Sequence, residues 1–226
     1  MPFYLAGALI LTAVWLALAL ANPNPPRKSL FMGSLFGVAA VAIAQLYALR
    51  DYWHPTYVAW PVNFEDFFYG LAIGGIAASA YEVAFRRRRA KLLGAHFQAE
   101  WFVGFIAFAA VLFPVLTFYL GLNSIVSHLV PPLVIAGVVF ATRRDLVLPS
   151  LFAALAVTVV TAATFLALQA LYPSLFASWH LADLSGFSVL GIPAEELLFA
   201  FALGLGGSHC YEFLFGERFE LARRGR

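Results

Sequence analysis

Seven long apolar runs decide what this chain can fold into. Each is close to the roughly 20 residues that a helix needs to cross a bilayer, and segments rich in Asn, Pro, Ser or Gly fall between them. The runs are Phe3–Ala21, Leu30–Leu49, Phe67–Phe85, Trp101–Leu122, Val126–Thr142, Leu146–Leu171 and Ile192–Phe215. The sequence therefore predicts an all-α integral membrane protein with seven transmembrane helices, forming one membrane domain over residues 1–226.

Composition supports this prediction and excludes other classes of protein. Of the 226 residues 62% are hydrophobic and 12% charged, which argues against a soluble fold and against nucleic-acid binding. Cys210 is the lone cysteine, which excludes an internal disulfide and a cysteine-based metal site. Lys28 and Lys91 lie outside the runs, so a retinal Schiff base is excluded. Without an Asp-rich motif or a Gly-x-Gly-x-x-Gly segment, we expect no metal and no cofactor.

The distribution of positive charge along the sequence predicts how the chain is oriented in the membrane. Every lysine and arginine except Arg50 falls on one side of the seven-helix arrangement. The positive-inside rule then places the N-terminus outside and the C-terminus in the cytoplasm of a multi-pass cell-membrane protein. The run Arg86–Arg89 is interpreted as a topology anchor, with binding to anionic lipid headgroups as the alternative.

The third and seventh runs match without gaps at an offset of 130 residues. The matched pairs are Glu65 with Glu195, Asp66 with Glu196, Gly74 with Gly204, Tyr81 with Tyr211, Glu82 with Glu212, and Phe85 with Phe215. The pattern predicts a parallel 3+1+3 repeat, because one spanning helix separates two three-helix units. These are residues 1–92, a linker helix at 100–122, and residues 123–226. Glycines midway along the two matched runs are interpreted as sites of close helix packing, with contact with a flat polyene as the alternative. They are Gly74, Gly75, Gly204, Gly206 and Gly207.

Two pairs of adjacent acids, Glu65-Asp66 and Glu195-Glu196, are the candidate catalytic residues. A carboxylate at a helix N-terminus can be a simple cap, but capping explains one acid at each place and not two. Adjacent carboxyls in an apolar site do not both ionise cheaply, so one stays protonated and becomes a general acid. Nearby aromatic rings can stabilise a cation without attacking it. The candidate substrate-binding residues are Phe64, Phe67, Phe68, Tyr69, Phe199 and Phe201.

Other polar residues in the runs are given structural roles. Glu82 lies four residues before Arg86, a spacing that predicts an interfacial ion pair, and Glu212 is likewise interpreted as structural. Trp53-His54 and Trp179-His180 are interpreted as interfacial belts, with proton shuttling as the alternative. His128 lies near the outer end of the fifth run, and His209 is interpreted as a hydrogen-bonded interior residue.

The segment Ile192-Pro193-Ala194-Glu195-Glu196-Leu197-Leu198-Phe199 resembles the Pro-x-Glu-(Glu/Asp) motif of the lycopene cyclase domain family. These integral-membrane carotenoid cyclases occur as paired small subunits or as one fused chain with two such units. The resemblance implies redox-neutral closure of the ends of lycopene to β-type rings, with the motif acids as proton donors. The first unit departs from the motif, since Asn63 stands where the motif has proline.

The motif difference predicts different roles for the two acid pairs. We expect Glu195 and Glu196 to contain the principal acid, with Glu65 and Asp66 orienting it, receiving the proton back or stabilising the cation. Both pairs should converge in one cavity in the outer half of the membrane. The expected partners are a lipophilic polyene or isoprenoid and the bilayer, and the sequence leaves the oligomeric state open. The alternative is a small proton-coupled transporter or channel with a parallel repeat.

Overall fold

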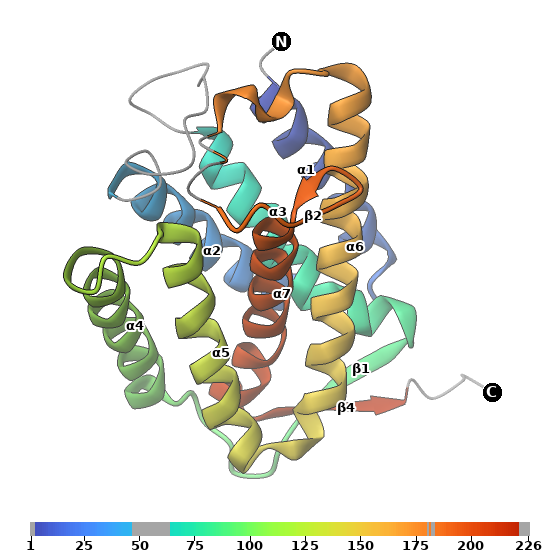
Figure 1. Ribbon diagram of the computed structural model, residues 1–226. Helices are drawn as coiled ribbons and strands as arrows, with labels where there is room; N and C mark the ends of the chain where they lie inside the picture. Colours follow the sequence, from blue (N-terminus) through green and yellow to red (C-terminus); the bar gives the residue numbers. More distant parts are fainter. Residues whose placement is uncertain (1–2, 47–63, 180, 182–183, 222–226) are drawn as a thin grey trace.

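The computed structural model describes residues 3–46, 64–179, 181 and 184–221, and its dominant elements are long helices (Figure 1). Seven helices in this part of the chain are long and apolar enough to cross a membrane, which confirms the predicted fold class. They are α1 (Phe3–Ala21), α2 (Arg27–Leu46), α3 (Phe64–Ala84), α4 (Ala99–Pro114), α5 (Ser124–Thr142), α6 (Val147–Leu171) and α7 (Ala194–Phe215). A π-helical segment, η2 (Val115–Tyr119), continues α4, and short 3₁₀ segments, η3 (Arg144–Leu146) and η4 (Leu175–Ser178), flank α6.

Two helices begin so that they include charged residues discussed below. α3 begins at Phe64, three residues before the predicted run, so Glu65 and Asp66 lie in its first turn. α2 begins at Arg27, directly after Pro25-Pro26, and therefore includes Lys28. Proline is favoured around the first turn of a helix because its missing N–H is not needed there.

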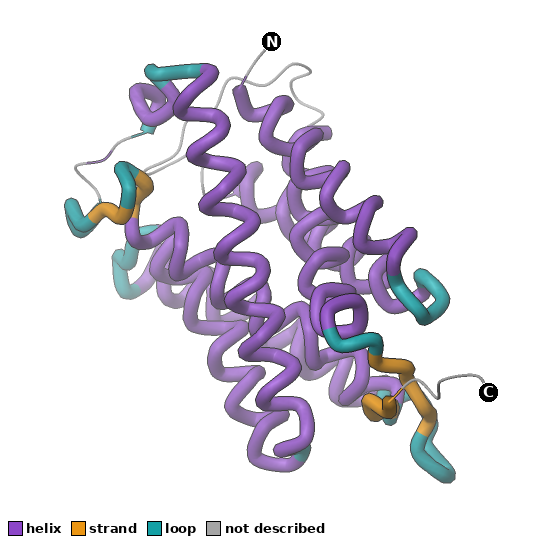
Figure 2. Tube along the Cα trace, turned by 90° about the vertical axis from the view of Figure 1, so that its right-hand side faces the viewer, coloured by secondary structure: helices purple, strands orange, loops and turns teal. Residues whose placement is uncertain are grey.

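α3 and α7 form the centre of the bundle. About 61% of the residues in the α3 span and 67% in the α7 span are buried, against at most 33% in each of the others. α3 packs against α1, α2 and α6, α7 packs against α5 and α6, and the two central helices also contact each other. Figures 1 and 2 show this arrangement from two directions. The acids in the first turns of α3 and α7 consequently begin helices that are enclosed by neighbours.

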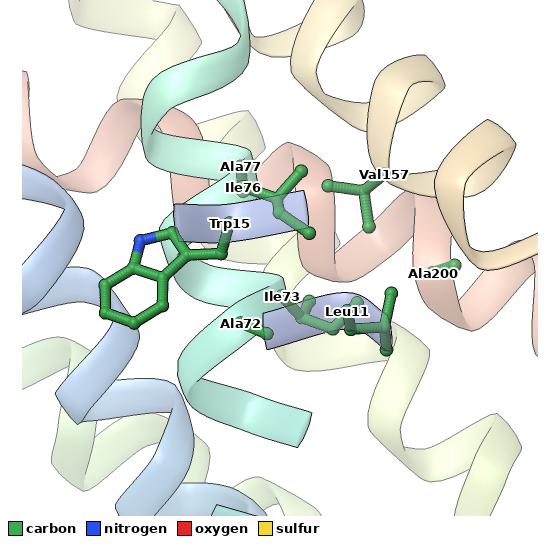
Figure 3. Close-up of a cluster of buried hydrophobic side chains, with 8 residues drawn as sticks. All are labelled: Leu11, Trp15, Ala72, Ile73, Ile76, Ala77, Val157 and Ala200. Atoms are coloured by element: carbon green, nitrogen blue, oxygen red, sulfur yellow. The ribbon is translucent and has the colours of Figure 1, made fainter. Parts of the chain in front are cut away.

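An apolar cluster holds four of the helices together (Figure 3). It joins α1, α3, α6 and α7, and the residues drawn are Leu11, Trp15, Ala72, Ile73, Ile76, Ala77, Val157 and Ala200. Burying large side chains of this kind contributes about 1.5–3 kcal/mol each in water, but in a bilayer the gain comes from close van der Waals packing.

Glycines allow the central helices to approach their neighbours closely. A Cβ atom on Gly74 would lie 2.6 Å from the Met32 carbonyl oxygen of α2. A Cβ on Gly204 would lie 2.7 Å from Ala154 Cα of α6. Contacts this short leave no room for a side chain, which confirms the packing interpretation for Gly74 and Gly204, whereas Gly206 lines the cavity described below.

A two-stranded ribbon closes one end of the bundle, which we call the ribbon end. β1 (Arg87–Lys91) follows α3, β4 (Glu217–Leu221) follows α7, and the strands pair antiparallel with Arg89 opposite Phe219. Arg86 (φ 47°) and Gly216 (φ 61°) each turn the chain from helix into strand. Every one of these features recurs at the offset of 130 residues found in the helices. A small hairpin of β2 (Ser188–Val189) and β3 (Ile192–Pro193) precedes α7 at the opposite end, the acid end.

Candidate functional site

One apolar cavity of about 710 Å³ runs through the bundle and touches all seven helices. Its wall extends from Tyr4 and Trp179 near the acid end to Cys210 and Leu214 near the ribbon end. Most of the remaining lining is Ala, Leu, Ile, Phe and Pro. The volume falls within the roughly 300–1,000 Å³ of small-molecule sites, and the apolar wall suits a hydrocarbon ligand.

Asp66 and Glu196 both line this cavity, one from each central helix. Their side chains are 2% and 6% exposed, so water has little access to either carboxyl group. The Tyr4 hydroxyl of α1 donates a hydrogen bond to Asp66 Oδ1. Tyr69 lies within electrostatic range of both carboxyls and also lines the cavity. The structure thus brings one acid of each predicted pair together around a single apolar space.

The other acid of each pair is buried but does not line the cavity. Glu65 is 1% exposed, and Glu195 is 7% exposed. Glu195 Oε1 accepts a hydrogen bond from the Ser185 backbone N–H at 2.6 Å, which ties the start of α7 to the preceding loop. Successive residues on an α-helix point about 100° apart, and here the second acid of each pair lines the cavity while the first points elsewhere.

The predicted aromatic lining is only partly realised. Tyr69 and Phe199 line the cavity. Phe64 and Phe68 are 54% and 39% exposed and point away from the bundle interior. Phe67 packs over the Gly37 backbone, and Phe201 packs beside a cluster of Ala136, Ala154 and Leu205. The other phenylalanine rings of the wall come from helices that carry no acid pair, namely Phe3, Phe36, Phe102, Phe105, Phe113 and Phe165.

Sequence reasoning gave no role to Tyr4 or His128, both of which line the cavity. The His128 ring centroid lies 4.2 Å from that of Phe113 and 5.5 Å from that of Phe199. A sequence pattern could have pointed to both residues, because each begins a set of positions i, i+3, i+4 and i+7 that share one face of its helix. Trp53-His54, Asn63 and His180 lie outside the described residues.

The expected ion pair between Glu82 and Arg86 is wrong. Arg86 leaves the helix at positive φ, so the (i, i+4) geometry is lost. Glu82 instead contacts Lys28 Nζ and Arg89 Nε, both at 3.2 Å, and accepts from Asn24 Nδ2 at 2.8 Å. Lys28 Nζ also lies 2.7 Å from Glu212 Oε1. These contacts form a buried charged cluster beneath the ribbon, distant in the fold from the acid end, and they fit the structural role expected of Glu82 and Glu212.

Metal ligands do not gather in the described part of the chain, where no group of three or more His, Cys, Asp or Glu side chains is arranged to hold an ion.

Comparison with known proteins gives one finding. The protein-family model described as lycopene cyclase matches residues 129–214, which extend from α5 almost to the end of α7. No curated protein and no solved structure matches the chain. The match supports a carotenoid cyclase-type function and a multi-pass membrane location. Residues 129–214, which include Glu195 and Glu196, thus match the lycopene cyclase family, as the Pro193-x-Glu195-Glu196 motif predicted.

Proposed function

We propose that this protein cyclises a linear carotenoid end to a β-type ring inside the bilayer, with Glu196 as the principal proton donor. The observation that carries the proposal is the shared cavity, in which Glu196 and Asp66 face the same apolar space from two packed helices. The match to the lycopene cyclase family over residues 129–214 supports the same class of reaction.

The chemistry follows from an acid held beside alkenes in a dry cavity. Glu196 transfers its proton to the terminal double bond of the substrate, which leaves a tertiary carbocation. A second double bond in the same chain attacks that cation, so a carbon–carbon bond closes the ring and the positive charge moves to a ring carbon. Loss of a proton from the neighbouring carbon forms the ring alkene. The reaction gains and loses one proton and needs no oxidant or reductant.

Asp66 and Tyr69 are assigned supporting roles. An ionised Asp66, held by the Tyr4 hydroxyl, supplies negative charge that stabilises the cation electrostatically. The Tyr69 and Phe199 rings offer π-faces that attract a cation, and the Phe199 ring carries no heteroatom that would trap it. Exclusion of water by the apolar wall prevents hydration of the cation.

The orientation is part of the proposal. Contacts made by Lys28, Arg89 and Arg143 bring separate basic segments together at the ribbon end, since Arg143 Nη2 donates to the Glu217 carbonyl oxygen at 2.8 Å. We assign this end to the cytoplasm under the positive-inside rule, which puts the acid end in the outer half of the membrane.

The test is expression in a bacterium that accumulates lycopene, with pigments separated by chromatography. Wild-type protein should convert lycopene to cyclised product, and Glu196→Gln should lower the rate about 10²–10⁴-fold because an amide cannot donate a proton of suitable acidity. Glu195→Gln should retain far more activity, since Glu195 anchors the Ser185 loop. Glu100→Gln, on the exposed first turn of α4, is the matched control. Unchanged lycopene with wild-type protein present in the membrane would refute the proposal.

A further inference from the structure

We propose that His128 is the general base that removes the proton from the cyclised cation. This inference rests on the proposed cyclase function and adds a second catalytic residue to it. The site as described has a proton donor, an Asp66 carboxylate assigned to stabilising the cation, and aromatic rings. The ring alkene forms only when a base takes a proton from the carbon beside the cation, and we assign that step to a separate residue.

Hydrogen bonding fixes which nitrogen of His128 is available. Nδ1 lies 2.5 Å from the Ser124 carbonyl oxygen. A carbonyl oxygen only accepts, so Nδ1 carries the hydrogen and Nε2 keeps its lone pair. Among the described residues Nε2 has no hydrogen-bond partner, although the side chain is only 9% exposed. An imidazole in this state keeps a basic nitrogen in a dry environment, on a residue that lines the cavity.

His128 occupies the same position on the cavity-lining face of α5 that Tyr4 occupies on the cavity-lining face of α1. α1 lines the cavity with Tyr4, Gly7, Ala8 and Leu11, and α5 lines it with His128, Pro131, Pro132 and Ile135. Both sets follow the i, i+3, i+4, i+7 face of a helix, and every pair is 124 residues apart. α1 packs on α3 as α5 packs on α7.

This correspondence puts one polar side chain of a neighbouring helix in the wall for each cavity acid. Tyr4 donates to Asp66, and at the matching position His128 lines the same cavity as Glu196 and Phe199. The Phe199 ring, one helical turn after Glu196, lies with its centroid 5.5 Å from that of His128 in an edge-on arrangement. A phenol holds a carboxylate in place, whereas a neutral imidazole accepts a proton. The two halves of the cavity therefore differ in chemistry although they are built alike.

The complete cycle balances. The Glu196 O–H bond breaks as a C–H bond forms on the substrate, and ring closure makes one C–C bond. The C–H bond beside the ring cation then breaks, its electron pair forms the ring alkene, and the proton moves to His128 Nε2. The imidazolium returns a proton to the Glu196 carboxylate, which restores both groups. Substrate and product are isomers.

The position of the base also bears on specificity. Whichever hydrogen lies nearest to Nε2 is the one removed, so the imidazole decides where the ring double bond forms. The Phe113 and Phe199 rings that contact the imidazole restrict its orientation and favour a single outcome.

The experiment compares His128→Gln and His128→Tyr with wild type in membranes supplied with lycopene, normalising rates to protein in the membrane. Gln removes the basic nitrogen, and Tyr installs the side chain found at position 4. His209→Gln is the control, since His209 is a buried histidine of α7 that does not line the cavity.

We expect both His128 variants to cyclise about 10²-fold more slowly and to give a mixture of ring double-bond positions, with the control close to wild type. A His128 variant with the wild-type rate and a single unchanged ring alkene would overturn the assignment. Inactive wild-type protein would instead refute the cyclase function itself, so the two failures are distinguishable.

Discussion

Lys28 Nζ lies 2.7 Å from Glu212 Oε1, and the two side chains are 3% and 0% exposed. The same ammonium group contacts Glu82 at 3.2 Å, so one lysine of α2 joins the ends of both central helices. Arg89 of β1 adds a second positive charge to Glu82 and contacts Glu217 of β4 at 3.2 Å. The ribbon end is therefore held by charge, whereas the bundle interior is held by apolar packing.

Lys28→Met should strongly destabilise the fold. Removing the ammonium leaves Glu212 without its ion-pair contact and Glu82 with Arg89, and breaking a buried ion pair typically costs about 3–5 kcal/mol. Thermal unfolding of the detergent-solubilised protein would measure the loss. Lys91→Met, at an exposed position of β1, is the control and should change the melting temperature little.

A double substitution separates charge from packing in that cluster. Lys28→Met combined with Glu212→Gln should recover part of the lost stability, because one uncompensated buried charge is gone. If the double variant were less stable than Lys28→Met alone, uncompensated charge would not be the source of the loss.

Gly204→Ala should also destabilise the fold, through helix packing. Its Cβ would lie 2.7 Å from Ala154 Cα and 3.0 Å from the Ala153 carbonyl oxygen, so α6 and α7 would have to move apart. Overpacking of this kind costs about 1–3 kcal/mol. Gly137→Ala is the matched control, since no heavy atom lies within 4 Å of its Cβ position, and its melting temperature should match or exceed that of wild type.

The number of helices and the close-packing glycines could be predicted from the sequence because both depend on local properties. Apolar length defines a span, and a glycine in a span indicates close approach. The partner of Glu82 could not be predicted in this way. Arg86 is close along the chain, but Lys28 is 54 residues away and reaches Glu82 only because α2 packs on α3.

The candidate site likewise depends on helix packing, which the sequence does not reveal. The sequence located two acid pairs, yet which acid of each pair faces the cavity depends on how α3 and α7 are rotated against their neighbours. The rotation of α3 also explains why Phe64 and Phe68 do not line the cavity, since both lie on an outward-facing side of that helix. Tyr4 lies within an apolar run, so the sequence did not indicate its hydrogen bond to Asp66 on another helix.

Tyr4→Phe and Asp66→Asn should have effects that do not add. Tyr4 donates its hydroxyl hydrogen to Asp66, so removing either partner removes the same interaction, and hydrogen bonds to charged groups contribute about 1.5–3 kcal/mol. We expect either single variant to lower the cyclisation rate, and the double variant to be little worse than Asp66→Asn. Tyr119→Phe, at a position 85% exposed, is the control. Strictly additive losses would show that the two side chains act independently.

Single cysteines should report opposite sides of the membrane for the two ends of the bundle. Cys210 is first replaced by alanine, and a cysteine is then introduced either at Arg88, exposed on β1, or at Phe187, which is 75% exposed beside the β2–β3 hairpin. A membrane-impermeant maleimide applied to spheroplasts should label Phe187→Cys directly. It should label Arg88→Cys only after the membrane is permeabilised, because the basic segments around the ribbon are retained in the cytoplasm during insertion. The physical consequence is that Asp66 and Glu196 would approach the substrate from the outer half of the bilayer, with the polyene chain extending toward Cys210 and Leu214. The reverse labelling pattern would move the acids to the cytoplasmic half and would leave the cavity and its chemistry as described.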